Sequence, residues 1–229
     1  MFTKAPGLGR PLFETVHAVS AGLWLGSLVM SAATAGLLFG TMRSLDPSFG
    51  FFSAYTGPQS DLGAGYIQNR IFLAGDVMQF IGATGSLAAT IALIGFCGLS
   101  LRRVSTGIRV FALGAAMALV SYHLFVLVPR MQTNAHAYWE AARAGEMDAA
   151  TTAYDAFQAD HPTARNEMLA TTVVVALMLG AGAWSAATTG RPDEPITRDD
   201  RSPRARPASR LEEPKLARST PGGRAGGRS

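Results

Sequence analysis

Residues 13–38 read FETVHAVSAGLWLGSLVMSAATAGLL, an apolar run that only Glu14 and His17 interrupt, both near its start. A helix of about 20 apolar residues crosses the roughly 30 Å of hydrocarbon in a bilayer. Three further runs of this kind occupy residues 71–99, 110–128 and 168–187. Backbone polar groups in lipid must be satisfied within the segment, so these runs are expected to be helices. The sequence therefore predicts an all-α integral membrane four-helix bundle within residues 1–190.

The charge of the chain is distributed unevenly between this bundle and the C-terminal tail. Charged residues make up 16% of the chain, below the roughly 25% of ordinary soluble domains. The net charge of +4 arises in residues 191–229, while the rest of the chain is neutral, so nucleic acid is not an expected partner. The tail is rich in Arg, Pro, Gly and Ser, and this composition predicts disorder. The single cysteine, Cys97, excludes an intrachain disulfide.

The connections between the spans differ in composition. Residues 41–70 contain many Gly, Pro and aromatic residues, which predicts an irregular loop at the membrane surface. Residues 130–166 are rich in alanine and predict one or two surface helices. Pro162 would then lie in the first turn of the fourth spanning helix, a position that tolerates the missing N–H.

Basic residues predict the orientation of the bundle. The region before the first span, the second connection and the tail are expected on the same side of the membrane. Outside the tail, the basic residues of this side are Lys4, Arg10, Arg102, Arg103 and Arg109. Cytoplasmic segments carry the excess of Lys and Arg, so we expect both termini in the cytoplasm, with the chain in a bacterial inner membrane. An alternative is a signal peptide cleaved near residues 33–35, Ala-Thr-Ala, which would leave the other three helices oriented as before.

The first span carries two rows of side chains at helical spacing. One row is polar and aromatic: His17, Ser20, Trp24, Ser27 and Ser31. The second row is small: Ala18, Gly22 and Gly26. Small residues spaced by four allow helices in membranes to approach closely, either within the chain or in a homo- or hetero-oligomer.

Polar residues of the later spans are expected to meet in the outer half of the bundle. Asp76 lies shortly after the start of the second span, and His123 lies shortly before the end of the third. Gln79 follows Asp76 on the same helix face, while Asn166 and Glu167 lie just above this layer. Ionisable groups inside a membrane are candidates for function. Two interpretations remain open: a proton relay or substrate contact, and a polar pair that fixes helix packing.

No cofactor is expected from the histidines. His17 and His123 lie near opposite ends of their spans, about 14 Å apart in depth, so they could not bind one haem iron. His123 could pair with His136 or His161 on the outer side, which keeps a haem- or copper-handling protein as an alternative. The sequence contains no phosphate-binding glycine loop, nucleophile elbow or zinc-protease motif, so an enzyme is not expected.

Short motifs of the chain resemble the four-helix membrane family related to transmembrane protein 205, whose bacterial members carry a domain of unknown function. The matching residues are His17, Trp24-Leu25-Gly26-Ser27, Asn69-Arg70, Pro129, Met131, Phe157, His161 and Asn166. A proline after His161 and a long first loop depart from the family pattern. The resemblance implies a fold and a membrane location, but no reaction.

The sequence therefore favours a non-enzymatic membrane bundle that binds or passes a small solute or supports a partner complex. A small proton-coupled transporter that uses Asp76 and His123 is the second hypothesis. The candidate residues for substrate contact or proton relay are Asp76, Gln79, His123, Asn166 and His17.

Overall fold

A computed structural model describes residues 9–189, and this part of the chain contains helices and no strands. The elements are α1 Gly9–Leu45, η1 Gly50–Phe52, α2 Gln59–Gly95, α3 Val104–Tyr122, η2 His123–Leu127, α4 Val128–Ala144 and α5 Met147–Thr189. Four helical segments are long and apolar enough to cross a membrane, which confirms the predicted all-α membrane bundle. The predicted tail at residues 191–229 lies outside the described residues.

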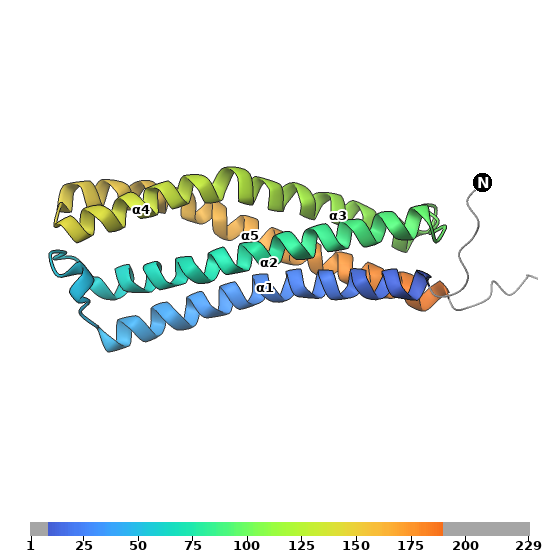
Figure 1. Cartoon of the computed structure of the whole chain (residues 1–229), viewed down its shortest axis with the longest axis horizontal. Coiled ribbons are helices and arrows are strands. Elements are labelled where there is room, and N and C mark those ends of the chain that lie inside the picture. Colours follow the sequence, from blue (N-terminus) through green and yellow to red (C-terminus); the bar gives the residue numbers. More distant parts are fainter. Residues whose placement is uncertain (1–8, 190–229) are drawn as a thin grey trace, which may run out of the picture. The chain divides into compact units, whose positions relative to one another are not determined.

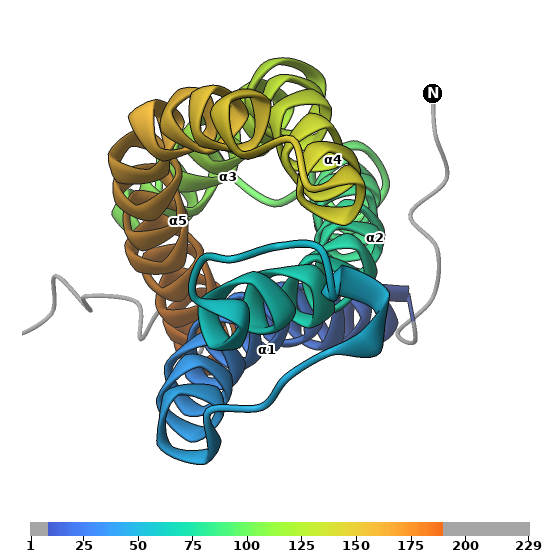
Figure 2. The same ribbon diagram turned by 90° about the vertical axis from the view of Figure 1, so that its left-hand side faces the viewer.

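The four long segments run up and down and form two hairpins (Figure 1). α1 packs mainly on α2, whereas α3, η2 and α4 form one continuous rod that packs on α5. Further contacts of α1 with α5 and of α2 with α3 join the hairpins. We call the end where α1 begins and α5 ends the terminal end, and the end with the α1–α2 and α4–α5 connections the distal end (Figure 2).

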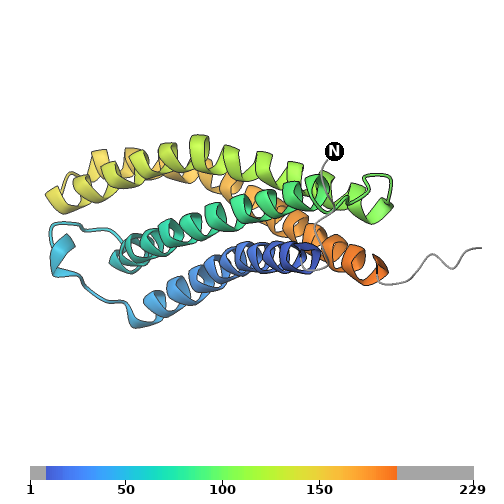
Figure 3. The same ribbon diagram turned by 45° about the vertical axis from the view of Figure 1, so that its right-hand side comes forward.

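The helices extend well beyond the predicted spans at the distal end. α1 and α2 each contain 37 residues and α5 contains 43, or about 55–65 Å at 1.5 Å per residue. The hydrocarbon core of a bilayer takes about 30 Å of this length. The remainder forms a distal head, residues 39–70 and 129–166, in which the α1–α2 hairpin diverges from α4 and α5 (Figure 3).

The predicted connections were wrong in extent. The irregular part of residues 41–70 is confined to residues 46–58, because α1 continues to Leu45 and α2 already begins at Gln59. Conversely, α2 ends at Gly95, so residues 96–99 belong to the second connection rather than to a span. Pairing between elements of the head stabilises the added turns, for example the bidentate contact of Arg43 with Asp61.

The surface helices predicted over residues 130–166 are continuations of the spanning helices. Pro162 lies inside α5, not in its first turn. Its missing N–H leaves the carbonyl of Gln158 without the usual helical donor. Asp160, two residues before this proline, accepts from Arg130 of α4, with N···O distances of 2.7 and 2.6 Å.

The apolar core lies in the spanning part and contains side chains from all four segments. Its buried members are Ala21, Trp24, Leu28, Ala83, Ala112, Leu113, Ala116, Val120, Val175 and Met178. Large apolar side chains such as Phe111, Phe125 and Leu37 remain 72–80% exposed on the outside. This distribution fits helices that face lipid rather than water.

The polar and aromatic row of α1 shares one face, as its spacing predicted, and this face meets the core, where His17, Trp24 and Ser31 are buried. The small-residue row is on the other side, where Gly22 and Gly26 have open space around them. Close approach of α1 and α2 depends instead on Gly82 of α2. A Cβ there would lie 2.7 Å from Trp24 Cβ and 2.8 Å from the Ser20 carbonyl oxygen.

Replacing Gly82 with Ala should therefore destabilise the bundle by about 1–3 kcal/mol, because the new methyl group meets backbone atoms that cannot rotate away. The matched control is Gly22→Ala on α1, which adds the same methyl group where nothing lies within 4 Å. Thermal unfolding in detergent micelles, followed by circular dichroism, measures both. Equal midpoints for the two variants would contradict the close approach.

Candidate functional site

Three ionisable side chains from three segments meet on the distal side of the apolar core. His123 Nε2 lies 3.1 Å from Asp76 Oδ1, and His123 Nδ1 lies 2.9 Å from Glu167 Oε2. The first contact is a hydrogen bond, while the second is an ion-pair contact without hydrogen-bond alignment. The side chains of His123, Asp76 and Glu167 are 17%, 13% and 7% exposed. We call this group the distal triad.

Neighbouring polar groups hold both carboxylates in place. Gln79, one turn further along α2, donates from Nε2 to Asp76 Oδ1 at 3.3 Å. Thr171, one turn further along α5, donates from Oγ1 to Glu167 Oε1 at 2.7 Å. Each carboxylate thus has a neutral donor on its own helix and the imidazole opposite, which fixes its orientation toward His123.

His123 opens the π-helical turn η2, in which the Val128 N–H donates to the His123 carbonyl five residues earlier. Pro129, at the start of α4, gives a physical reason for this turn. Proline has no N–H for the carbonyl at i−4, which is that of Phe125, and its ring crowds that carbonyl in an α-helix. Single π-turns inside α-helices occur frequently at functional sites.

The depth argument placed Asp76, Gln79 and His123 near one another, as they are in the structure. It put Asn166 and Glu167 together just above them, and the candidate residues included Asn166 but not Glu167. Asn166 is exposed, whereas Glu167 is buried and contacts His123. Adjacent helical residues differ by about 100° in direction, so equal depth does not imply a shared face. The signal that identifies Glu167 is its spacing with the buried Thr171 and Val175, each four residues apart.

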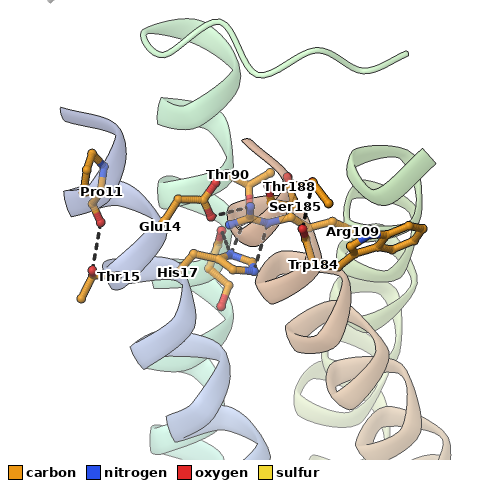
Figure 4. Close-up of polar contacts among 10 residues, drawn as sticks. Pro11, Glu14, Thr15, His17, Thr90, Arg109, Trp184, Ser185 and Thr188 are labelled. Carbon is orange, nitrogen blue, oxygen red and sulfur yellow. Dashed lines mark hydrogen bonds and ion pairs between the residues drawn. The ribbon is translucent and has the colours of Figure 1, made fainter. Parts of the chain in front are cut away.

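A second polar cluster lies at the terminal end and is built around a buried arginine (Figure 4). Arg109 of α3 is 0% exposed, and its Nη1 donates to Glu14 Oε2 of α1 at 2.8 Å. Its Nε donates to His17 Nε2 at 3.1 Å. α5 closes the cluster through Gly182, where a Cβ would lie 3.2 Å from the His17 ring. We call Glu14, His17 and Arg109 the terminal cluster.

The contacts of His17 define its tautomer. Nε2 must accept, because the guanidinium of Arg109 can only donate. The ring proton of neutral His17 therefore lies on Nδ1, which is 3.4 Å from the Ser86 carbonyl oxygen and 3.3 Å from Thr90 Oγ1. A proton added at Nε2 would break the bond to Arg109 and place two cations in contact, so this arrangement requires neutral His17.

The sequence placed His17 near one end of its span and predicted no ionisable partner for it there, which was wrong. Sequence reasoning assigned Arg109 to the second connection with Arg102 and Arg103, but α3 begins at Val104 and contains it. Glu14, which was not among the candidate residues, is its ion-pair partner. A usable signal was the spacing of Thr106, Arg109 and Leu113 by three and four residues, which puts the arginine on the buried face.

The two clusters differ in charge. In the terminal cluster the guanidinium of Arg109 and the carboxylate of Glu14 balance, with His17 neutral. The distal triad has two carboxylates for one imidazole, so it carries one net negative charge even when the imidazole is protonated. One further proton makes it neutral. Burying net charge is costly. The distal triad is therefore the cluster in which the number of bound protons should change.

Apolar side chains separate the two clusters. Asp76 and Thr90, which contact one cluster each, are fourteen residues apart on α2, or about 21 Å at 1.5 Å per residue. Ala83 lies midway between them and belongs to the core formed by Trp24, Leu113 and Met178. The bundle therefore has two polar clusters with an apolar layer between them.

The remaining histidines lie elsewhere in the head. His136 donates from Nδ1 to the Gln132 carbonyl on α4, and the His161 ring makes a tilted contact with the ring of Phe157 on α5. His17 and His123 are in different clusters about 21 Å apart in depth, further than the roughly 14 Å predicted. Within residues 9–189, His, Cys, Asp and Glu side chains form no group of three with the geometry of a metal site.

Replacing Arg109 with Gln should destabilise the bundle by about 3–5 kcal/mol, because Glu14 then keeps a buried charge without a partner. The double replacement Glu14→Gln with Arg109→Gln should cost less than the sum of the single changes, since it removes both charges. Unfolding in micelles measures the free energies, and Arg102→Gln is the control for an exposed arginine. An Arg109→Gln effect no larger than that of the control would refute the pairing.

The described part of the chain is helical and has four segments that are long and apolar enough to cross a membrane. No protein-family model, no curated protein and no solved structure matches the chain.

Proposed function

We propose that this chain is a non-enzymatic, multi-pass membrane protein that binds and releases protons at the distal triad and couples this exchange to the passage of a small solute. The observation that carries the proposal is the excess carboxylate beside His123. Imidazole is the side chain whose protonation changes most readily near neutral pH. Two carboxylates around it offer further sites for the same proton.

The position of the triad supports proton exchange rather than packing alone. Its side chains are 7–17% exposed, so each keeps a small surface outside the packed core. They come from α2, η2 and α5, and therefore bridge the two hairpins. A change in proton number alters the attraction between Asp76, His123 and Glu167, and with it the contact between the hairpins.

The terminal cluster supports the same proposal by its contrast with the triad. Its ion pair joins α1 to α3, and it lies beyond the apolar layer. A carrier must not be open at both ends at once, and an apolar layer next to a balanced ion pair closes one end. The proposal therefore assigns proton exchange with the triad to the distal end.

The excess of basic residues supports a cytoplasmic terminal end in a bacterial inner membrane. Arg102 and Arg103 are exposed there and contribute to it, whereas the charge of buried Arg109 is matched by Glu14. The resemblance to the family related to transmembrane protein 205 is part of the proposal. Several of its motif residues have structural roles; for example, Trp24 is in the apolar core, and Asn69 accepts a hydrogen bond from Gln132.

The decisive experiment measures proton flux in liposomes that contain the purified chain and an internal pH-sensitive dye, with a mixture of sugars and zwitterionic amino acids supplied outside as the solute to be coupled. The wild type should dissipate an imposed pH gradient faster than protein-free liposomes. Asp76→Asn and Glu167→Gln should each reduce this flux at least tenfold, because each removes one of the exchangeable carboxyl groups while keeping side-chain shape.

The matched control is Asp61→Asn, which makes the same change on the same helix in the exposed pair with Arg43. It should leave the flux unchanged. Thermal unfolding of each variant shows whether the bundle remains folded. Wild-type liposomes no faster than empty ones, or a folded Asp76→Asn variant with full flux, would refute the proposal.

A further inference from the structure

A cavity of about 130 Å³ lies in the distal head, between α2, α4 and the loop that precedes α2. Its lining residues are Phe51, Tyr66, Arg70, His136, Trp139, Glu140 and Arg143. We propose that this cavity binds a small organic acid, with its carboxylate between Arg70 and Arg143 and its flat apolar part against the aromatic rings. The proposal does not rest on proton exchange at the distal triad.

Ring contacts hold Arg70 and Arg143 in place, and no carboxylate within residues 9–189 balances their charge. The guanidinium of Arg70 lies 5.9 Å from the centre of the Tyr66 ring, and that of Arg143 lies 5.3 Å from the centre of the Phe51 ring. These contacts hold the side chains over ring faces. Within the described residues neither arginine forms an ion pair, in contrast to Arg43, Arg109 and Arg130 of the same chain. Their N–H groups thus remain available for a carboxylate.

The rings form the apolar part of the cavity. Tyr66 packs edge-on against Trp139 with centres 5.1 Å apart, and Trp139 packs against His136 at 5.3 Å. Tyr66 is also in contact with Phe51 at 6.2 Å. A set of mutually packed rings is rigid, so a flat ligand can contact it with little ordering of side chains.

Glu140 is the one acidic group of the lining, and it restricts the ligand. It repels a simple anion such as phosphate, which has charge on all sides. A carboxylic acid with a flat apolar body can place its charge near the two arginines and keep Glu140 against an uncharged edge. The charge pattern therefore favours an organic acid over an inorganic anion.

The height of the cavity favours a ligand from the aqueous phase over a lipid headgroup. Tyr66 lies five residues before the predicted start of the second span at residue 71, or about 8 Å at 1.5 Å per residue. Trp139 lies at the same height, because its ring is in contact with that of Tyr66. The rings that line the cavity thus stand above the edge of the hydrocarbon.

The test uses the full chain in nanodiscs of neutral lipid, with benzoate as the probe and calorimetry as the readout. Benzoate should bind, and it should change the fluorescence of Trp139, a change that Trp139→Phe removes. Arg70→Gln and Arg143→Gln should each weaken binding about tenfold or more, because each removes a charge-assisted contact. Arg102→Gln, which removes an exposed arginine at the terminal end, should bind as the wild type does.

Three further measurements could overturn the proposal. Inorganic phosphate that binds as tightly as benzoate would show that the rings contribute nothing. Benzylammonium that binds in place of benzoate would assign the cavity to cations through Glu140. Anionic lipid in the nanodiscs that displaces benzoate would identify a headgroup site. Absence of benzoate binding, or full binding by folded Arg70→Gln and Arg143→Gln variants, would also refute it.

Discussion

The constraint on which this structure depends is that charge inside a low-dielectric bundle must be matched within the bundle. Arg109 has no exposed surface, so Glu14 and His17 of α1 must be close to it, and this fixes how α1 lies against α3. The same constraint acts at Asp76, His123 and Glu167 and joins α2, η2 and α5. The side chains of the apolar core between these clusters are all apolar and could pack in several ways. The charged contacts therefore determine how each helix is rotated about its own axis.

Composition was sufficient to predict four membrane-spanning helices, because a helix is the structure that satisfies the backbone of an isolated apolar run in lipid. Composition did not predict where the helices begin and end. The added turns in the distal head carry polar residues, and contacts such as those of Arg43 with Asp61 and Arg130 with Asp160 stabilise them. Pro162 illustrates the same limit, since α5 continues through a residue that usually marks a helix start.

Counting residues from the span ends brought Asp76 and His123 together, because depth in an antiparallel pair follows from the rise per residue alone. It could not choose between Asn166 and Glu167, which differ in direction and hardly in depth. Arg109 was missed for another reason. Its surroundings, LRRVSTGIR, have the polar composition of a connection, and its burial became evident only with the partners that α1 supplies.

The π-turn at His123–Leu127 determines which side of α4 faces α2. A π-turn contains one residue more than an α-helical hydrogen bond spans, so everything beyond it is rotated by about 100° relative to an unbroken α-helix. α4 therefore presents Trp139 and Gln132 to α2, although α3 uses its own face for the core. Loss of a single residue within this turn would restore the α-helical pitch and turn the aromatic side of α4 away from α2, while leaving every span long enough to cross the membrane.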